Sequence, residues 1–139
     1  MIAQMPLIQE VVSAFGIPIF EKEGYEADDL IGTLATQAAE KGYDVRIVTG
    51  DRDLFQLVNE RIHVLMPVNN SQFTEFDTKA VIQYYGIHPN QVVDYKALAG
   101  DASDNIPGVR GIGDKTALQL LVRFDSLSNI YDELDTIEE

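Results

Sequence analysis

The feature that most constrains the fold is an amphipathic helix pattern that lies between two short apolar segments. From Glu26 to about Lys41 apolar side chains recur with helical spacing, and Gly42 follows where a left-handed residue would end a helix. The flanking segments "IPIFE" (17–21) and "DVRIVTG" (44–50) have the composition of strands. Two strands joined by a helix of this length form a βαβ unit with parallel strands and a right-handed crossover. The first half of the chain is therefore predicted to be α/β.

Further elements are expected on both sides of this unit. Before it we expect a helix over 6–15; after it we expect a short helix from about Asp51, a strand at 62–66 and an outer β segment at 71–76. From Thr78 onward only helices are expected, over 78–86, 89–100, 115–124 and 126–134. The sequence thus predicts an α/β core over 1–76 and a helical subdomain over 77–139. No low-complexity linker separates them, so we expect the two parts to pack directly.

The composition excludes several classes of protein and site. The 139 residues provide enough chain for one compact domain with a core. No apolar run approaches the roughly 20 residues of a membrane span. The absence of cysteine excludes disulfides and thiolate metal sites, so a reducing cytoplasm is the expected location. The net charge of -13 would by itself indicate repulsion from nucleic acid.

The acidic residues are concentrated in three short clusters, "YEADD", "GDRD" and "GDASD". The first cluster (Glu26, Asp28, Asp29) follows the predicted strand 17–21, and the second (Asp51, Asp53) follows the predicted strand 44–49. In a parallel sheet both would lie at the carboxyl edge, where open α/β sheets bind ligands. Five carboxylates at one edge would raise one another's pKa values unless a cation neutralised them. Hard divalent ions such as Mg²⁺ or Mn²⁺ fit such oxygen ligands, and two of them can promote phosphodiester cleavage.

Each cluster also has a simpler interpretation. Acids in the first turn of a helix are stabilised by the helix dipole, which would account for "YEADD" without any metal. Asp51 could be an N-cap, and Asp101 and Asp104 of the third cluster could cap turns in a loop. The presence of three clusters, two of them on one predicted edge, favours the metal hypothesis.

A glycine-rich stretch, "IPGVRGIGDKTA" (106–117), follows the third cluster. Gly108, Gly111 and Gly113 allow positive backbone dihedrals, so that successive N–H groups could face a phosphate chain. The helix that begins near Lys115 would add its positive end. Such a hairpin recognises backbone and carries little base information. An ordinary turn between helices is the alternative interpretation.

Three stretches together carry a resemblance to a known family. "GYEADDLIGTLA", "VTGDRDLFQLV" and "LAGDASDNIPGVRGIGDKTALQLL" closely resemble the 5′ nuclease domains of the bacterial DNA polymerase I type, and more loosely the flap endonucleases. The resemblance implies a PIN-like α/β core with a parallel sheet and flanking helices, followed by a helix-three-turn-helix (helix-hairpin-helix) subdomain. It also implies two divalent ions that support cleavage of 5′ flaps, with flapped or nicked duplex DNA as the partner.

The resemblance assigns roles to particular residues. The implied metal ligands are Glu26, Asp28, Asp29, Asp51, Asp53, Asp101 and Asp104. Among them Asp28, Asp29, Asp51 and Asp53 are expected to form the catalytic centre. The implied DNA-binding residues are Gly108, Val109, Arg110, Gly111, Ile112, Gly113, Lys115 and Thr116, in a hairpin where the family can also hold a K⁺ ion on backbone carbonyls.

The resemblance begins late in the family pattern. Members of the family start with a strand that bears a metal-binding Asp, then a second acidic strand and a basic helical arch, all of which would precede Met1. We therefore expect an N-terminally shortened domain with a tendency to associate, whose partners include the missing part of the domain or polymerase domains. A non-catalytic fragment that only binds duplex DNA is the alternative function. A phosphatase suggested by "DRDLF" would leave the hairpin unexplained.

Overall fold

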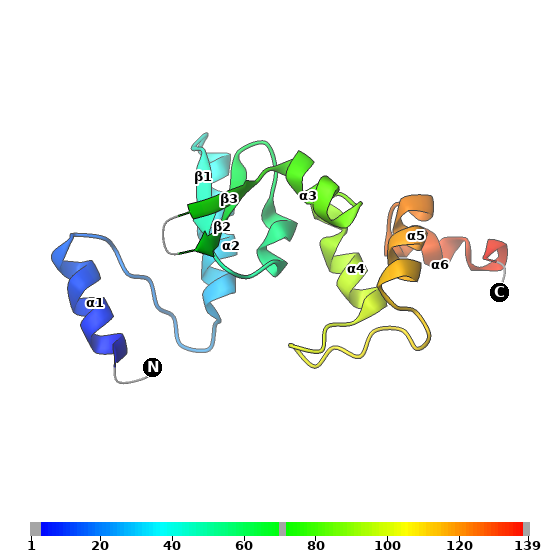
Figure 1. Ribbon diagram of the computed structural model, residues 1–139, viewed down its shortest axis with the longest axis horizontal. Helices are drawn as coiled ribbons and strands as arrows, with labels where there is room; N and C mark the ends of the chain where they lie inside the picture. The colour runs from blue at the N-terminus through cyan, green and yellow to red at the C-terminus, as the bar shows by residue number, and fades with distance from the viewer. Residues whose placement is uncertain (1–3, 70–71, 138–139) are drawn as a thin grey trace.

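The computed structural model describes residues 4–69 and 72–137, which form a small α/β part followed by a helical part (Figure 1). The α/β part contains α1 (Met5–Ala14), α2 (Ala27–Glu40), β1 (Val45–Val48), the 3-10 helix η2 (Asp53–Leu57), β2 (Ile62–Asn69) and β3 (Gln72–Phe76). The helical part contains α3 (Thr78–Tyr85), η3 (Pro89–Gln91), α4 (Val92–Ala99), α5 (Asp114–Phe124), α6 (Leu127–Asp132) and η4 (Leu134–Thr136). The predicted helices and the strands after residue 44 are confirmed, with shifts of a few residues at their ends. Ser71, the start of the predicted outer β segment, lies outside the described residues.

The sheet has the order β1-β2-β3 and is mixed. β1 pairs in parallel with β2, and β2 pairs antiparallel with β3. The chain returns from β1 to β2 through η2, where Leu54 and Phe55 are buried. The parallel pairing that the sequence predicted is therefore present, but between β1 and β2.

The predicted strand at 17–21 is wrong, and with it the predicted βαβ unit. This segment has no regular secondary structure, and Ile17, Ile19 and Phe20 are exposed. A strand exists only by pairing with a neighbour, because its backbone hydrogen bonds are made between strands. In the part of the chain that the structure describes, β1 pairs only with β2 and no strand lies beside 17–21. Local sequence preference was therefore not enough to form the strand.

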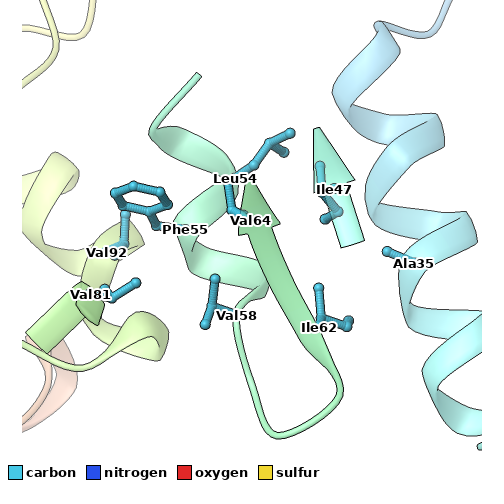
Figure 2. Close-up of a cluster of buried hydrophobic side chains, with 9 residues drawn as sticks. All are labelled: Ala35, Ile47, Leu54, Phe55, Val58, Ile62, Val64, Val81 and Val92. Carbon is cyan, nitrogen blue, oxygen red and sulfur yellow. The ribbon is translucent and has the colours of Figure 1, made fainter. Parts of the chain in front are cut away.

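Two clusters of buried apolar side chains hold the fold together. The first lies among α2, the sheet, η2 and the starts of α3 and α4 (Figure 2), and consists of Ala35, Ile47, Leu54, Phe55, Val58, Ile62, Val64, Val81 and Val92. The second lies within the helical part and consists of Ile87, Leu98, Ala117, Leu121, Phe124 and Ile130. Tyr85 packs against both clusters, so the two parts are joined through apolar contacts. This continuity fixes η2 relative to α4, which matters for the site.

The α1 segment lies apart from these cores (Figure 1). None of its residues is buried, and Leu7, Ile8 and Val11 are among the exposed large apolar side chains. The chain exposes 10306 Å² of surface, whereas a folded monomer of this mass is expected to expose about 7,200 Å². None of the residues over 4–26 is buried, so α1 and the segment after it contribute to this excess. None of the described helices is both long and apolar enough to span a bilayer.

Candidate metal centre and glycine-rich turn

The first two acidic clusters lie close together because α2 and β1 run in opposite directions. A tight turn at residues 41–44 joins the end of α2 to the start of β1, and the two elements pack on each other. The start of α2, which carries Asp28, therefore faces the end of β1, which Asp51 follows. The expected proximity is thus present, but it arises from a helix packed against the following strand and not from two parallel strands.

The acids of the first cluster differ in their local roles. The backbone N–H of Glu26 donates to Oδ2 of Asp29 over 3.0 Å, so these two residues form the start of α2 as a capping box. Asp28 is half-buried and lies close enough to other acids for their charges to act on it. Its burial, followed by the charges of Asp51, Glu26, Asp53 and Asp29, raises the pKa of the Asp28 carboxyl above its ordinary value. The local capping interpretation therefore describes Glu26 and Asp29, whereas Asp28 belongs to a shared acidic site.

The second cluster is held by a hydrogen-bonded turn at the end of β1. The N–H of Asp51 donates to Thr49 Oγ1 over 3.0 Å, and the N–H of Asp53 donates to Asp51 Oδ1 over 2.9 Å. Such side-chain bonds to backbone end the strand and start η2. Asp53 is thereby directed toward the helical part of the molecule.

The third cluster meets Asp53 across the junction between the two parts. Asp101 and Ile106 form an isolated antiparallel bridge that closes the loop between them, and Asp101 Oδ1 accepts a 2.9 Å hydrogen bond from the N–H of Ser103. Carboxylate oxygens of Asp53, Asp101 and Asp104 all lie within 4.8 Å of one another. The charge of Asp101, with partial burial and the charges of Asp53 and Asp51, raises the pKa of Asp104. The second cluster therefore interacts electrostatically with both the first and the third.

One cation, which the sequence analysis missed, lies among these acids. Lys96 Nζ is 2.6 Å from Asp53 Oδ1 and also donates to Asp101 Oδ2. Partial burial alone would lower the pKa of the Lys96 ammonium, but its hydrogen bonds to Asp101 and Asp53 outweigh burial and raise the pKa. The same contact, with hydrogen bonds from Ser103, lowers the pKa of Asp101 to about 2. A lysine in the last turn of the helix before an acidic loop was the available sequence signal.

These groups line a pocket of about 340 Å³. Its polar lining includes Asp53, Asp101, Asp104 and Lys96, and its apolar lining includes Val92 and Ile106. Three carboxylates whose oxygens can meet at one point form a donor set of hard oxygen ligands, and the charge of Asp101 is the first cause of the raised pKa of Asp104. The residues therefore fit a hard divalent cation.

The glycine-rich turn follows this pocket and leads into α5. Gly108 and Gly111 have positive φ, 65° and 87°, as expected, but Gly113 has φ -102° and serves as the N-cap of α5. The expectation of a positive dihedral at Gly113 is therefore wrong, because an N-cap residue takes an extended backbone. Arg110, Gly111, Gly113, Lys115 and Thr116 are exposed around this turn, Val109 is largely exposed, and Ile112 packs against the second core.

Gly108 has a structural reason to be glycine that is independent of any ligand. A Cβ atom at this position would lie 2.6 Å from the carbonyl carbon and 2.8 Å from the carbonyl oxygen of Ala99, and closer still to the amide nitrogen of Gly100. The turn is thus packed against the end of α4, where the N–H of Val109 donates to Leu98 O over 2.8 Å. This contact places the turn beside the loop that carries Asp101 and Asp104.

Comparisons with known proteins agree with this arrangement. The family model described as the 5′-3′ exonuclease N-terminal resolvase-like domain matches residues 1–86, and that of the 5′-3′ exonuclease C-terminal SAM fold matches residues 87–139. The chain belongs to the 5′-3′ exonuclease family. Residues 87–139, which include the glycine-rich turn, match the SAM-fold model, whereas α3 lies within the N-terminal match, and the predicted helical C-terminal subdomain is confirmed as a fold.

Curated relatives of this 5′-3′ exonuclease chain are much longer proteins. It is 48% identical over 135 residues to the thermostable DNA polymerase I of Thermus thermophilus, and 46% identical over 138 residues to DNA polymerase I of Bacillus caldotenax. Each match covers 97% of this chain and 16% of the relative. The chain therefore spans about a sixth of the length of these polymerases.

Solved nuclease structures share the fold. A T5 5′-exonuclease mutant aligns with a TM-score of 0.76 at 25% identity, covering 88% of this chain and 49% of that one. T5 5′-exonuclease with bound divalent zinc ions aligns with a TM-score of 0.80 at 24% identity, covering 92% and 46%. The catalytic core of Rad2 in complex with DNA substrate aligns at 0.66 and 20% identity, covering 98% and 41%. The α/β core followed by a helical subdomain is thus a nuclease fold.

Proposed function

We propose that this chain provides the acidic centre and the duplex-binding turn of a divalent-metal-dependent 5′-3′ exonuclease or flap endonuclease, acting on DNA in replication and repair. One observation carries the proposal. Carboxylates of Asp53, Asp101 and Asp104 meet at one pocket, the charges of Asp51 and Asp53 also act on Asp28 at the start of α2, and the glycine-rich turn packs beside the loop that carries Asp101 and Asp104. Membership of the 5′-3′ exonuclease family supports the same function.

The metal ligands that we propose are the carboxylates that lie close together or shift one another's pKa. Asp53, Asp101 and Asp104 would hold one ion, because their oxygens can reach a common point. Asp28 and Asp51 would hold a second, because the charge of Asp51 contributes to the raised pKa of Asp28. A divalent ion held by these carboxylates would supply Lewis-acid chemistry, favouring deprotonation of a water and stabilising the charge that develops on a phosphate. Glu26 and Asp29 would support the site by shaping the start of α2.

The turn and the start of α5 would hold the DNA backbone. The chain enters α5 at Asp114, so the first N–H groups of an eleven-residue helix are directed out of its N-terminus. The exposed cations Arg110 and Lys115 flank that point. Phosphate contacts of this kind position a duplex without reading its sequence, which suits an enzyme that recognises a 5′ end or a flap by shape. A K⁺ ion on the carbonyls of this turn stays a prediction.

Calorimetric titration with Mn²⁺ tests the metal half of the proposal. The chain is expected to bind Mn²⁺, and the double variant Asp28→Ala with Asp51→Ala is expected to lose the binding that depends on those residues. Asp44→Ala is the matched control, because Asp44 is an exposed acid whose ion pair is with Arg61 at the far end of β1. Equal titration curves for the double variant and the unaltered chain would contradict the ligand assignment.

A non-catalytic duplex-binding fragment is the second candidate function. Two observations favour it. Glu26 and Asp29 are used in helix capping, which leaves fewer carboxylates for metal binding, and the strand predicted at 17–21, after which these acids were expected to follow at the sheet edge, is not formed. Incubation with a labelled 5′-flap duplex and Mn²⁺ separates the candidates. Cleavage that Asp53→Ala abolishes would establish the nuclease, whereas tight flap binding without cleavage would establish the fragment.

A further inference from the structure

Lys96 connects the two halves of the acidic centre. It projects from the last turn of α4 in the helical part, and its ammonium pairs with Asp53 from η2 in the α/β part and with Asp101 from the following loop. About three-quarters of the Lys96 side chain is covered, with 24% of its surface exposed. The Asp101 side chain is covered more completely, with 8% of its surface exposed. This is a partly buried ion pair held from both sides, unlike an exposed pair that contributes little.

The Lys96 ammonium contacts two of the carboxylates that would bind the metal. Asp53 and Asp101 are two of the three acids whose oxygens can meet at one point, and both already direct an oxygen at Lys96 Nζ. A divalent ion held by these acids would lie close to a like charge and would compete with Lys96 for the same two carboxylates. A lysine ammonium is a compact point charge on a flexible stem, so it can withdraw without a change in the backbone.

We propose that Lys96 is a tethered counter-ion of this centre, which keeps Asp53 and Asp101 together in the metal-free chain and must be displaced when a divalent cation binds Asp53, Asp101 and Asp104. The proposal rests on the metal site named under the proposed function. Lys96 is thus a positioning residue that sets metal affinity, and it lowers that affinity while it stabilises the free protein.

The first test compares Mn²⁺ affinities of three chains by calorimetry. Lys96→Met keeps the apolar stem and removes the competing charge, and is expected to tighten Mn²⁺ binding at one site by about tenfold, since the ion pair no longer has to be broken. Lys79→Met is the matched control, because Lys79 is an exposed lysine on α3 outside the pocket. It makes the same change in net charge and is expected to alter affinity less than about twofold, the size of a screened surface charge effect.

Thermal unfolding of the same three chains in EDTA adds a readout that needs no metal. Lys96→Met is expected to unfold at lower temperature than Lys79→Met, and saturating Mn²⁺ is expected to return most of that loss. Unchanged stability in EDTA together with unchanged Mn²⁺ affinity would overturn the counter-ion role. If the unaltered chain binds Mn²⁺ and Lys96→Met binds no more tightly, only this inference fails; if neither chain binds Mn²⁺, the proposed metal site fails and this inference fails with it.

A second measurement follows the unaltered chain, and a conservative variant is needed only to assign one resonance. The side-chain ¹⁵N resonance of Lys96, assigned by its loss in Lys96→Arg, is followed during titration with diamagnetic Mg²⁺. It is expected to shift and to exchange its protons faster with water as the ammonium leaves Asp53 and Asp101. A Lys96 resonance that is unmoved while backbone signals of Asp53, Asp101 and Asp104 respond to Mg²⁺ would show that the cation binds beside an intact ion pair, which would overturn the proposal.

Discussion

Alanine substitution of the glycines in the turn gives the sharpest test of how the turn is built, because the three positions differ in one factor at a time. Gly108 has positive φ and no room for a Cβ, Gly111 has positive φ with no atom within 4 Å of its Cβ position, and Gly113 has neither constraint. Positive φ costs a non-glycine residue about 1–2 kcal/mol. Forcing an atom into packed backbone costs about 1–3 kcal/mol more.

These terms predict a ranked loss of the free energy of unfolding. Gly108→Ala should lose about 2–5 kcal/mol and Gly111→Ala about 1–2 kcal/mol, whereas Gly113→Ala should lose about 0.5–1 kcal/mol because alanine is the poorer N-cap. For a domain whose total stability is about 5–15 kcal/mol, the loss at Gly108 is severe and corresponds to a fall in the melting temperature of roughly 10 °C.

Urea unfolding followed by circular dichroism at 25 °C, with metal removed by EDTA, measures these differences. The slope of the unfolding transition should stay the same in all four chains, so that the midpoints report stability alone. If Gly108→Ala is no less stable than Gly111→Ala, the turn does not pack against Ala99 and Gly100 as described. The reasoning about the position of the glycine-rich turn beside the acidic loop would then be refuted.

Three further outcomes are expected. Glu75→Gln should lower stability at pH 7, because the hydrogen bond with His63 and then the charge of Arg46 hold the pKa of Glu75 below its ordinary value. The difference should shrink as the pH falls below the ordinary glutamate pKa of about 4.3 and should vanish once the pH is below the lowered pKa of the folded state, and a difference in urea unfolding that does not shrink on acidification would contradict it. Lys115→Ala should weaken duplex binding without changing Mn²⁺ affinity and should reduce the salt dependence of binding by about one unit of slope, measured by fluorescence anisotropy at several salt concentrations; an unchanged slope would remove Lys115 from the phosphate contacts. Sedimentation velocity should show association that grows with concentration and that Leu7→Ser lowers, because the α1 face is uncovered; a chain that is monomeric at every concentration would refute this.

The family relation places these tests in context. The chain is close in sequence to polymerases that are about six times its length, and it aligns with roughly half of each of the two T5 nuclease structures described above. The cleavage assay is therefore the experiment that decides whether the centre described here acts by itself. The metal and stability experiments remain informative whichever way that assay turns out, since they measure the residues of this chain directly.

Local sequence determined much of the secondary structure, because helices are stabilised by contacts within a few residues. Both α2 and α3 end beside a glycine with positive φ, Gly42 and Gly86. The sequence indicates such an end by a glycine that follows an amphipathic run. The acidic clusters and the glycine-rich turn were also identifiable, since each is a short contiguous motif. Their assignment to particular metal ions and to DNA stays a prediction.

Only the tertiary structure decided which of these motifs meet. A strand forms through a partner that lies elsewhere in the chain, so the strand-like composition of 17–21 could not show that it would remain unpaired. The meeting of Asp53 with Asp101 and Asp104 depends on how the apolar core fixes η2 against α4, and the pairing of Lys96 with two of these acids depends on the same contact. Charges from distant segments interact according to distance and burial, and both quantities are set by packing. The sequence therefore supplied the charged groups, and packing of the two parts made them one centre.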